Sequence, residues 1–167
     1  MSVEAVAASR DFENWYADLH PHLFASVLVL CGNRDIAQDA TDEALARALQ
    51  HWPRVRAMAS PEGWVYRVAV NVMRRSARRR AFESRLLRRL RTDDVTPAPS
   101  GEVWDLVRAL PVRQRTAVVL RYVADLGERE IAQVMGVTRG TVASTLSDAR
   151  RSLAVVLTES EIVEEQS

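Results

Sequence analysis

The chain has 167 residues, of which 47% are hydrophobic and 27% are charged, and its formal net charge is +1. This length is enough for one domain or two small ones. No apolar run reaches the roughly 18 residues that a membrane span needs, and the first residues lack a signal-peptide pattern. The single cysteine, Cys31, excludes an internal disulfide and a cysteine-rich zinc site. We therefore expect a cytoplasmic protein that does not insert into membranes.

The charges are strongly segregated along the chain. Residues 1–62 hold nine acidic residues and five arginines, whereas residues 74–91 hold nine arginines and one glutamate. The last ten residues contain four glutamates and no basic residue. Such segregation predicts partners of both signs.

Helical spacing of apolar residues begins in the first part of the chain. The stretch "DFENWYADLHPHLFASVLVLCG" predicts a first helix, bent around Pro21. A second helix is predicted from Asp35 to Trp52, ended by Pro53. Its apolar side is predicted to comprise Ile36, Ala40, Ala44, Leu45, Ala48, Leu49 and Trp52. Carboxylates gather on another side of the same helix, at Asp35, Asp39, Asp42 and Glu43.

A third helix is predicted to start at "SPEGW", with Ser60 as the N-cap and Pro61 in the first helical position. The spacing of its valines predicts that Val65, Val68 and Val72 face the core. Separations of four, three and four residues place a polar stripe on this helix. The stripe consists of Arg67, Asn71, Arg74 and Arg78.

The segment "TDDVTPAPSG", residues 92–101, contains two prolines and a glycine and has no helical pattern. It is typical of a linker that its prolines partly extend. We therefore predict an all-α protein of two small helical domains joined by a flexible linker. The domains are residues 11–91 and 102–157, and residues 158–167 form an acidic tail.

The C-terminal domain contains a predicted helix-turn-helix. Ile131, Ala132 and Met135 lie on one face of a short helix that ends at Gly136, and Thr138 is placed to cap the next helix. That next helix repeats apolar residues at Val142, Leu146, Ala149 and Leu153. Together with "EVWDLVRAL" and "PVRQRTAVVLRYVADL", four short helices are expected to pack around Leu120, Ile131, Val142 and Leu146.

Each charged feature has a plain explanation beside a functional one. The carboxylates can form a solvated face, but their mutual repulsion is easier to understand if a basic surface docks there. The arginine-rich run can be a solvated helix end, but a phosphate backbone is its natural partner. A helix-turn-helix also occurs in domains that bind no DNA. His20, His22 and His51 lack metal-ligand spacing, and no phosphate loop or nucleophile motif occurs, so we expect no catalytic residue, metal or cofactor.

Taken in order, these segments resemble a bacterial sigma factor of the extracytoplasmic-function (ECF) group. "RDIAQDATDEALARALQHW" is similar to the second conserved region of that family, whose acidic helix docks on the coiled coil of the RNA polymerase beta-prime subunit. The resemblance implies core polymerase contacts at Asp39, Asp42, Glu43 and Arg47.

The other two motifs resemble the promoter-reading segments of the family. "SPEGWVYRVAVNVMRRSARRR" implies −10 element contacts at Trp64, Tyr66, Arg67, Asn71, Arg74, Arg75 and Arg78, with flipped bases held near the loop "PRVRAMASP". The helix-turn-helix implies −35 element contacts at Thr138, Arg139, Thr141, Ser144, Thr145, Arg150 and Arg151. Ala143, Thr145 and Asp148 stand where the family usually has basic residues. An anti-sigma factor is implied as a further partner.

Two other interpretations remain open from the sequence. A helix-turn-helix regulator that acts without polymerase would leave the acidic helix unexplained. A pure interaction protein would use its arginines to bind an acidic protein. Salt dependence separates DNA from an apolar docking partner, and polymerase capture separates the sigma factor from the regulator.

Overall fold

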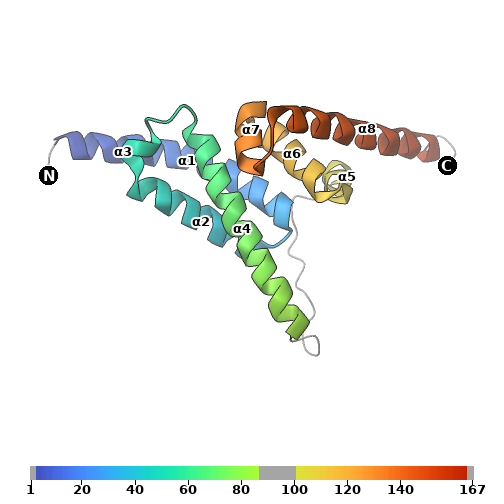
Figure 1. Cartoon of the computed structure of the whole chain (residues 1–167), viewed down its shortest axis with the longest axis horizontal. Helices are drawn as coiled ribbons and strands as arrows, with labels where there is room; N and C mark the ends of the chain where they lie inside the picture. Colours follow the sequence, from blue (N-terminus) through green and yellow to red (C-terminus); the bar gives the residue numbers. More distant parts are fainter. Residues whose placement is uncertain (1–2, 87–100, 165–167) are drawn as a thin grey trace. The chain divides into compact units, whose positions relative to one another are not determined.

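The computed structural model describes residues 3–86 and 101–164, with side chains over 10–83, 101 and 103–155. All regular structure in these residues is helical, as predicted (Figure 1). The chain divides into two compact units, residues 1–98 and 99–167. The predicted linker, apart from Gly101, and the end of the arginine run lie outside the described residues. No helix of the described residues is both long and apolar enough to cross a membrane.

The N-terminal unit is built on three long helices: α1 (Val3–Cys31), α2 (Arg34–Gln50) and α4 (Pro61–Leu86). A single turn, α3 (Trp52–Val55), joins α2 to the segment before α4. Helix α2 packs against both α1 and α4 (Figure 1). Helix α1 starts earlier than predicted and continues through Pro21, which lies inside it.

Local signals in the sequence account for the helix ends of this unit. The side chain of Asn33 caps α2 by accepting a hydrogen bond from the Ile36 backbone N–H at 3.0 Å. Ser60 caps α4 as predicted, since its hydroxyl accepts from the Gly63 N–H at 3.0 Å. Helix α2 ends at Gln50, so Pro53 lies in the first turn of α3 instead of ending α2.

The core of the unit differs in part from the predicted one. Leu49 was predicted to be buried but is 56% exposed, because the buried side of α2 is centred on Ala40 and Ala44. On α4, Val65 is buried but Val68 and Val72 are only half-buried. The buried side of α4 consists of Val65, Tyr66, Ala69, Val70 and Met73. At 100° per residue, this side lies roughly 100° around the helix from the valine side that the sequence predicted.

The C-terminal unit contains α5 (Glu102–Ala109), α6 (Val112–Tyr122), α7 (Glu128–Met135) and α8 (Arg139–Glu164). The four predicted core residues are confirmed: Leu120, Ile131 and Val142 are 0% exposed and Leu146 is 2% exposed. Helix α6 packs against both α7 and α8. Because α8 extends to Glu164, the acidic tail predicted from residue 158 begins as helix.

The turn of the helix-turn-helix forms as predicted. Gly136 ends α7 with φ 67°, a left-handed conformation that a residue without a Cβ adopts at little cost. Thr138 then caps α8, and its hydroxyl accepts from the Thr141 N–H at 3.1 Å. At the other end of α7, the Glu130 carboxylate accepts from the Gly127 N–H at 2.6 Å.

Candidate functional site: a charged groove and two DNA-facing surfaces

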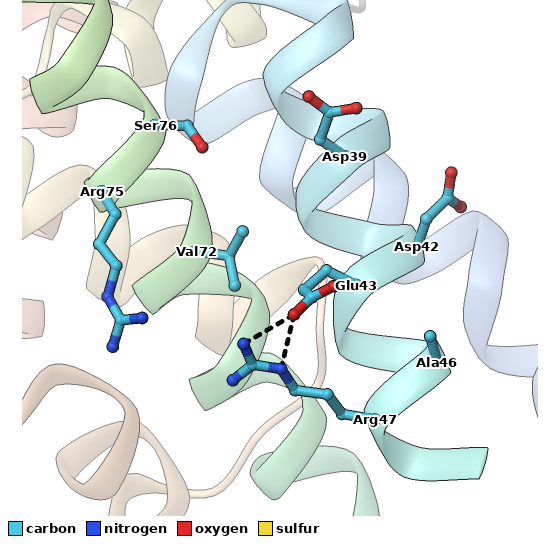
Figure 2. Close-up of a pocket in the computed structure, with 8 residues that line it drawn as sticks. All are labelled: Asp39, Asp42, Glu43, Ala46, Arg47, Val72, Arg75 and Ser76. Atoms are coloured by element: carbon cyan, nitrogen blue, oxygen red, sulfur yellow. Dashed lines mark hydrogen bonds and ion pairs between the residues drawn. The ribbon is translucent and has the colours of Figure 1, made fainter. Parts of the chain in front are cut away.

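A groove of about 560 Å³ lies between α2 and α4 in the N-terminal unit. The four residues predicted to contact polymerase all line it, so the structure brings them together. Figure 2 shows Asp39 and Asp42 on successive turns of α2, followed by the paired Glu43 and Arg47. Helix α4 contributes Val72, Arg75 and Ser76, and Ala46 completes the lining. The groove therefore places the mostly acidic side chains of α2 opposite Val72 and Arg75 of α4.

Internal contacts reduce the repulsion that the sequence suggested among the carboxylates of α2. The Arg47 guanidinium lies 2.6 Å from the Glu43 carboxylate, and Gln38 donates to Asp42 at 2.9 Å. Asp35 pairs with Arg80 of α4 at 3.4 Å. Among the described residues, neither the Asp39 carboxylate nor the Arg75 guanidinium has a hydrogen bond or ion pair. These two groups remain available to a partner.

Leu49 adds an exposed apolar side chain to the same face of α2. It follows Asp42 by seven residues, or two turns, so the two lie on one side of the helix. Its 56% exposure provides apolar area on the side of α2 that carries Asp42. The sequence predicted a buried Leu49 because it lies four residues after Leu45. That spacing places Leu49 at the edge of the buried side of α2, where a residue can be either buried or exposed.

The polar stripe on α4 faces solvent. Arg67, Asn71 and Arg78 are exposed, and Arg74 is half-buried. Partial burial lowers the pKa of the Arg74 guanidinium, and the positive charge of Arg78 one turn later lowers it further. An arginine remains charged in spite of such shifts, so the stripe concentrates positive charge. A phosphate backbone placed against it would relieve this repulsion.

Tyr66 does not share this exposed surface, and its contact with DNA stays a prediction. Its side chain is 1% exposed, and its hydroxyl lies 3.4 Å from the Ser26 hydroxyl of α1. Burial raises the pKa of the phenol, against a smaller lowering by the Ser26 hydrogen bond. Tyr66 is therefore a core residue that ties α4 to α1. Trp64, two residues earlier, is half-buried and stays beside the stripe.

The segment predicted to hold flipped bases, residues 53–61, includes most of α3 and the connection to α4. Its Arg56 pairs with Asp11 of α1 at 3.4 Å. The aromatic rings of Phe12, Trp15 and Trp52 lie together, with the Trp15 and Trp52 centroids 4.8 Å apart. The Trp15 indole N–H also donates to Glu62 in the first turn of α4, at 2.7 Å. These contacts fix both ends of the loop, and base binding there stays a prediction.

The exposed side of α8 is lined by hydroxyl groups. Ser144 and Thr145 both donate to the Thr141 carbonyl oxygen, at 3.0 and 2.7 Å. Because each hydroxyl proton is engaged, its oxygen lone pairs remain free to accept. Acceptors on a helix in the major groove match the amino groups of adenine and cytosine, and threonine methyls match the thymine methyl.

The arginines near this surface are each held by a neighbour in the same unit. Arg139 pairs with Glu128 of α7 at 3.7 Å, and Arg151 pairs with Asp148 at 3.2 Å. Arg150 donates to the Tyr122 hydroxyl at 3.0 Å. All three side chains are exposed, so they can reach phosphates only at the cost of these contacts. In the described residues no cluster of histidine, cysteine and acidic side chains could hold a metal ion.

Comparison with known proteins matches both units in chain order. The family model for Sigma-70 region 2 matches residues 15–83, and the model for Sigma-70 region 4 matches residues 100–153. The ECF RNA polymerase sigma factor SigL of Mycobacterium tuberculosis is 31% identical over 147 residues, which cover 82% of this chain and 83% of the relative.

The chain belongs to the ECF sigma factors. The RNA polymerase sigma-E factor of Streptomyces coelicolor is 29% identical over 144 residues, covering 83% of this chain and 81% of the relative. Among solved structures, the sigma factor RpoE of Bartonella quintana, in complex with the anti-sigma factor NepR, has the same fold. It has a TM-score of 0.76 at 21% identity and covers 89% of this chain and 98% of that one.

Region 2 of this sigma factor thus contains the charged groove and the arginine stripe, and region 4 contains the hydroxyl-lined helix. The sequence did not predict that residues of α4 line the groove. It predicted Val72 as a core residue and Arg75 as a DNA contact. Their position depends on how closely α2 approaches α4, which only the packed structure defines. Small buried residues permit this close approach: Ala40 and Ala44 of α2 and Ala69 of α4 are all 0% exposed.

Proposed function

We propose that this sigma factor directs core RNA polymerase to specific promoters by holding the enzyme with region 2 and reading the −10 and −35 elements with α4 and α8. The observation that carries the proposal is the match of region 2 and region 4, in that order, to two units with separate charged surfaces. The factor performs no chemistry itself, since phosphodiester synthesis belongs to the polymerase. It acts in the cytoplasm, where core polymerase is found.

The polymerase contact that we propose is the α2 wall of the groove. Asp39, Asp42, Glu43 and Arg47 would meet the coiled coil of the beta-prime subunit. Their exposure, shared groove and net negative charge support this assignment, since complementary charge speeds association and fixes the register of docking.

The −10 contact that we propose uses the stripe of Arg67, Asn71, Arg74 and Arg78, with Trp64 beside it. The −35 contact uses Thr138, Arg139, Thr141, Ser144, Thr145, Arg150 and Arg151 around the start and middle of α8. Because polymerase would hold both units, the second contact forms at a high effective concentration once the first has formed. Two modest contacts thereby give a selective promoter complex.

We also propose that an anti-sigma factor holds this chain inactive. The RpoE structure contains such a protein, NepR. The structural similarity to RpoE shows only that the two chains share a fold. Family membership supports the regulatory partner.

The proposed function is tested by run-off transcription with purified core polymerase and a promoter library. We expect transcripts that depend on the added chain. A chain that binds duplex DNA but ignores core polymerase would instead be a helix-turn-helix regulator.

Asp148 is expected to weaken the −35 contact. It lies on α8 and pairs with Arg151. Its negative charge therefore repels DNA phosphates, and the pair holds the Arg151 guanidinium away from them. In Asp148→Asn, Arg151 is released toward a phosphate. We expect tighter binding of the polymerase complex to promoter DNA and a slope of log affinity against log salt that is steeper by about one.

The matched control for this prediction is Asp105→Asn. Asp105 also pairs with an arginine three residues later, Arg108, but on α5, which is not a helix of the helix-turn-helix. Titration of promoter binding against salt should leave the slope of this variant unchanged. An unchanged slope in Asp148→Asn would show that Asp148 does not face the DNA.

A further inference from the structure

The groove between α2 and α4 carries both signs of charge, which an acidic docking face alone does not explain. Its lining includes three carboxylates, from Asp39, Asp42 and Glu43, and two guanidiniums, from Arg47 and Arg75. Glu43 and Arg47 neutralise each other at 2.6 Å. The charges left for a partner are therefore Asp39 and Asp42 on α2 and Arg75 on α4 (Figure 2).

Arg75 is displaced from the arginine stripe toward this groove. At 100° per residue, it lies roughly 70° around α4 from the centre of the stripe, on the side of Val72 and Ser76. Those two neighbours line the groove together with Arg75, whereas no stripe residue does. In Figure 2 the Val72 side chain points from α4 toward α2, and the Arg75 side chain extends from the edge of the α4 ribbon that lies farther from α2.

We propose that Arg75 binds the polymerase segment seated in the groove and does not contact −10 DNA. The seated segment is a helix of the beta-prime coiled coil that carries mixed charge: an acidic residue meets Arg75, and basic residues meet Asp39 and Asp42. This inference rests on the proposed function, and it adds the second wall of the docking site and the charge pattern of the partner.

Three features of the groove support a helical partner of this kind. Packed helices lie 8–10 Å apart as a rule, so a third helix fits along the seam between two of them. The half-buried Val72 and the exposed Ala46, which both line the groove, offer apolar contact for its buried side. The charges on either side of this apolar seam then select the partner's orientation, because a reversed helix would place like charges together.

The decisive experiment compares Arg75→Ala with Arg78→Ala in the full chain. Arg78 lies three residues later on the same helix, is exposed, and belongs to the stripe. The affinity of each labelled variant for purified core polymerase is measured without DNA. We expect Arg75→Ala to bind core about three- to tenfold more weakly, Arg75→Lys to keep most of the affinity, and Arg78→Ala to match the wild type.

Promoter binding is then measured with core polymerase saturating, so that loss of docking no longer contributes. Arg75→Ala should bind promoter DNA like the wild type, and Arg78→Ala should bind it more weakly. Wild-type core affinity in Arg75→Ala, or reduced promoter affinity at saturating core, would overturn the proposal. Asp39→Lys separates this failure from failure of the proposed function. Normal core binding by Asp39→Lys would show that polymerase does not dock in this groove at all.

Discussion

The double variant Asp39→Lys, Glu43→Lys should lose measurable binding to core RNA polymerase. Both carboxylates line the proposed docking groove and both are exposed. Like charges placed against each other across an interface cost several kcal/mol, so two reversals should weaken binding by more than about 100-fold. The Glu43 change also leaves Arg47 without its partner at 2.6 Å, which adds positive charge to the groove.

The measurement is equilibrium binding of labelled full chain to purified core polymerase at fixed ionic strength. Asp18→Lys, Glu13→Lys is the matched control, because both residues are exposed acids of the same unit on α1, outside the groove. This control should bind core like the wild type. If the Asp39 and Glu43 variant also binds normally while the control folds, polymerase does not dock on this face of α2.

The second large effect is expected at Tyr66. Tyr66→Ala should lower the free energy of unfolding of the N-terminal unit by about 3–5 kcal/mol, because it removes a large side chain that is 1% exposed. Tyr66→Phe keeps the ring and loses only the contact of the hydroxyl with Ser26. It should cost about 0.5–1.5 kcal/mol and leave promoter binding unchanged.

Urea unfolding followed by tryptophan fluorescence measures this effect, since Trp15, Trp52 and Trp64 all report on the N-terminal unit. Tyr16→Ala provides an exposed comparison on α1, with an expected cost below about 1 kcal/mol. Loss of −10 binding in a fully folded Tyr66→Phe variant would support the DNA contact that the family resemblance implied for Tyr66.

The local signals in the sequence were sufficient for the helix-turn-helix. Gly136 and Thr138 define the turn because a left-handed residue followed by a hydroxyl cap permits few alternatives. The apolar repeat at Val142, Leu146 and Ala149 then places the buried side of α8 correctly. Ser60 and Pro61 fix the start of α4 in the same way.

The orientation of α4 was harder to predict, because its apolar residues extend around the helix beyond the buried side. Tyr66 carries a polar hydroxyl and Ala69 is small, yet both are buried, while Val68 and Val72 are half-buried. A small residue permits close helix approach, and a tyrosine is tolerated inside when its hydroxyl has a partner. Tyr66 finds that partner in Ser26, 40 residues earlier, so sequence spacing does not reveal it.

Run-off transcription tests most directly whether this chain joins core polymerase to promoters through separate surfaces. Purified core polymerase, the full chain and a library of double-stranded templates are combined, and transcripts are sequenced. We predict transcripts that require the chain and start at a fixed distance from two short shared motifs. Core polymerase that binds the chain yet yields no such transcripts, or a chain that binds duplex DNA without binding core, would contradict this account.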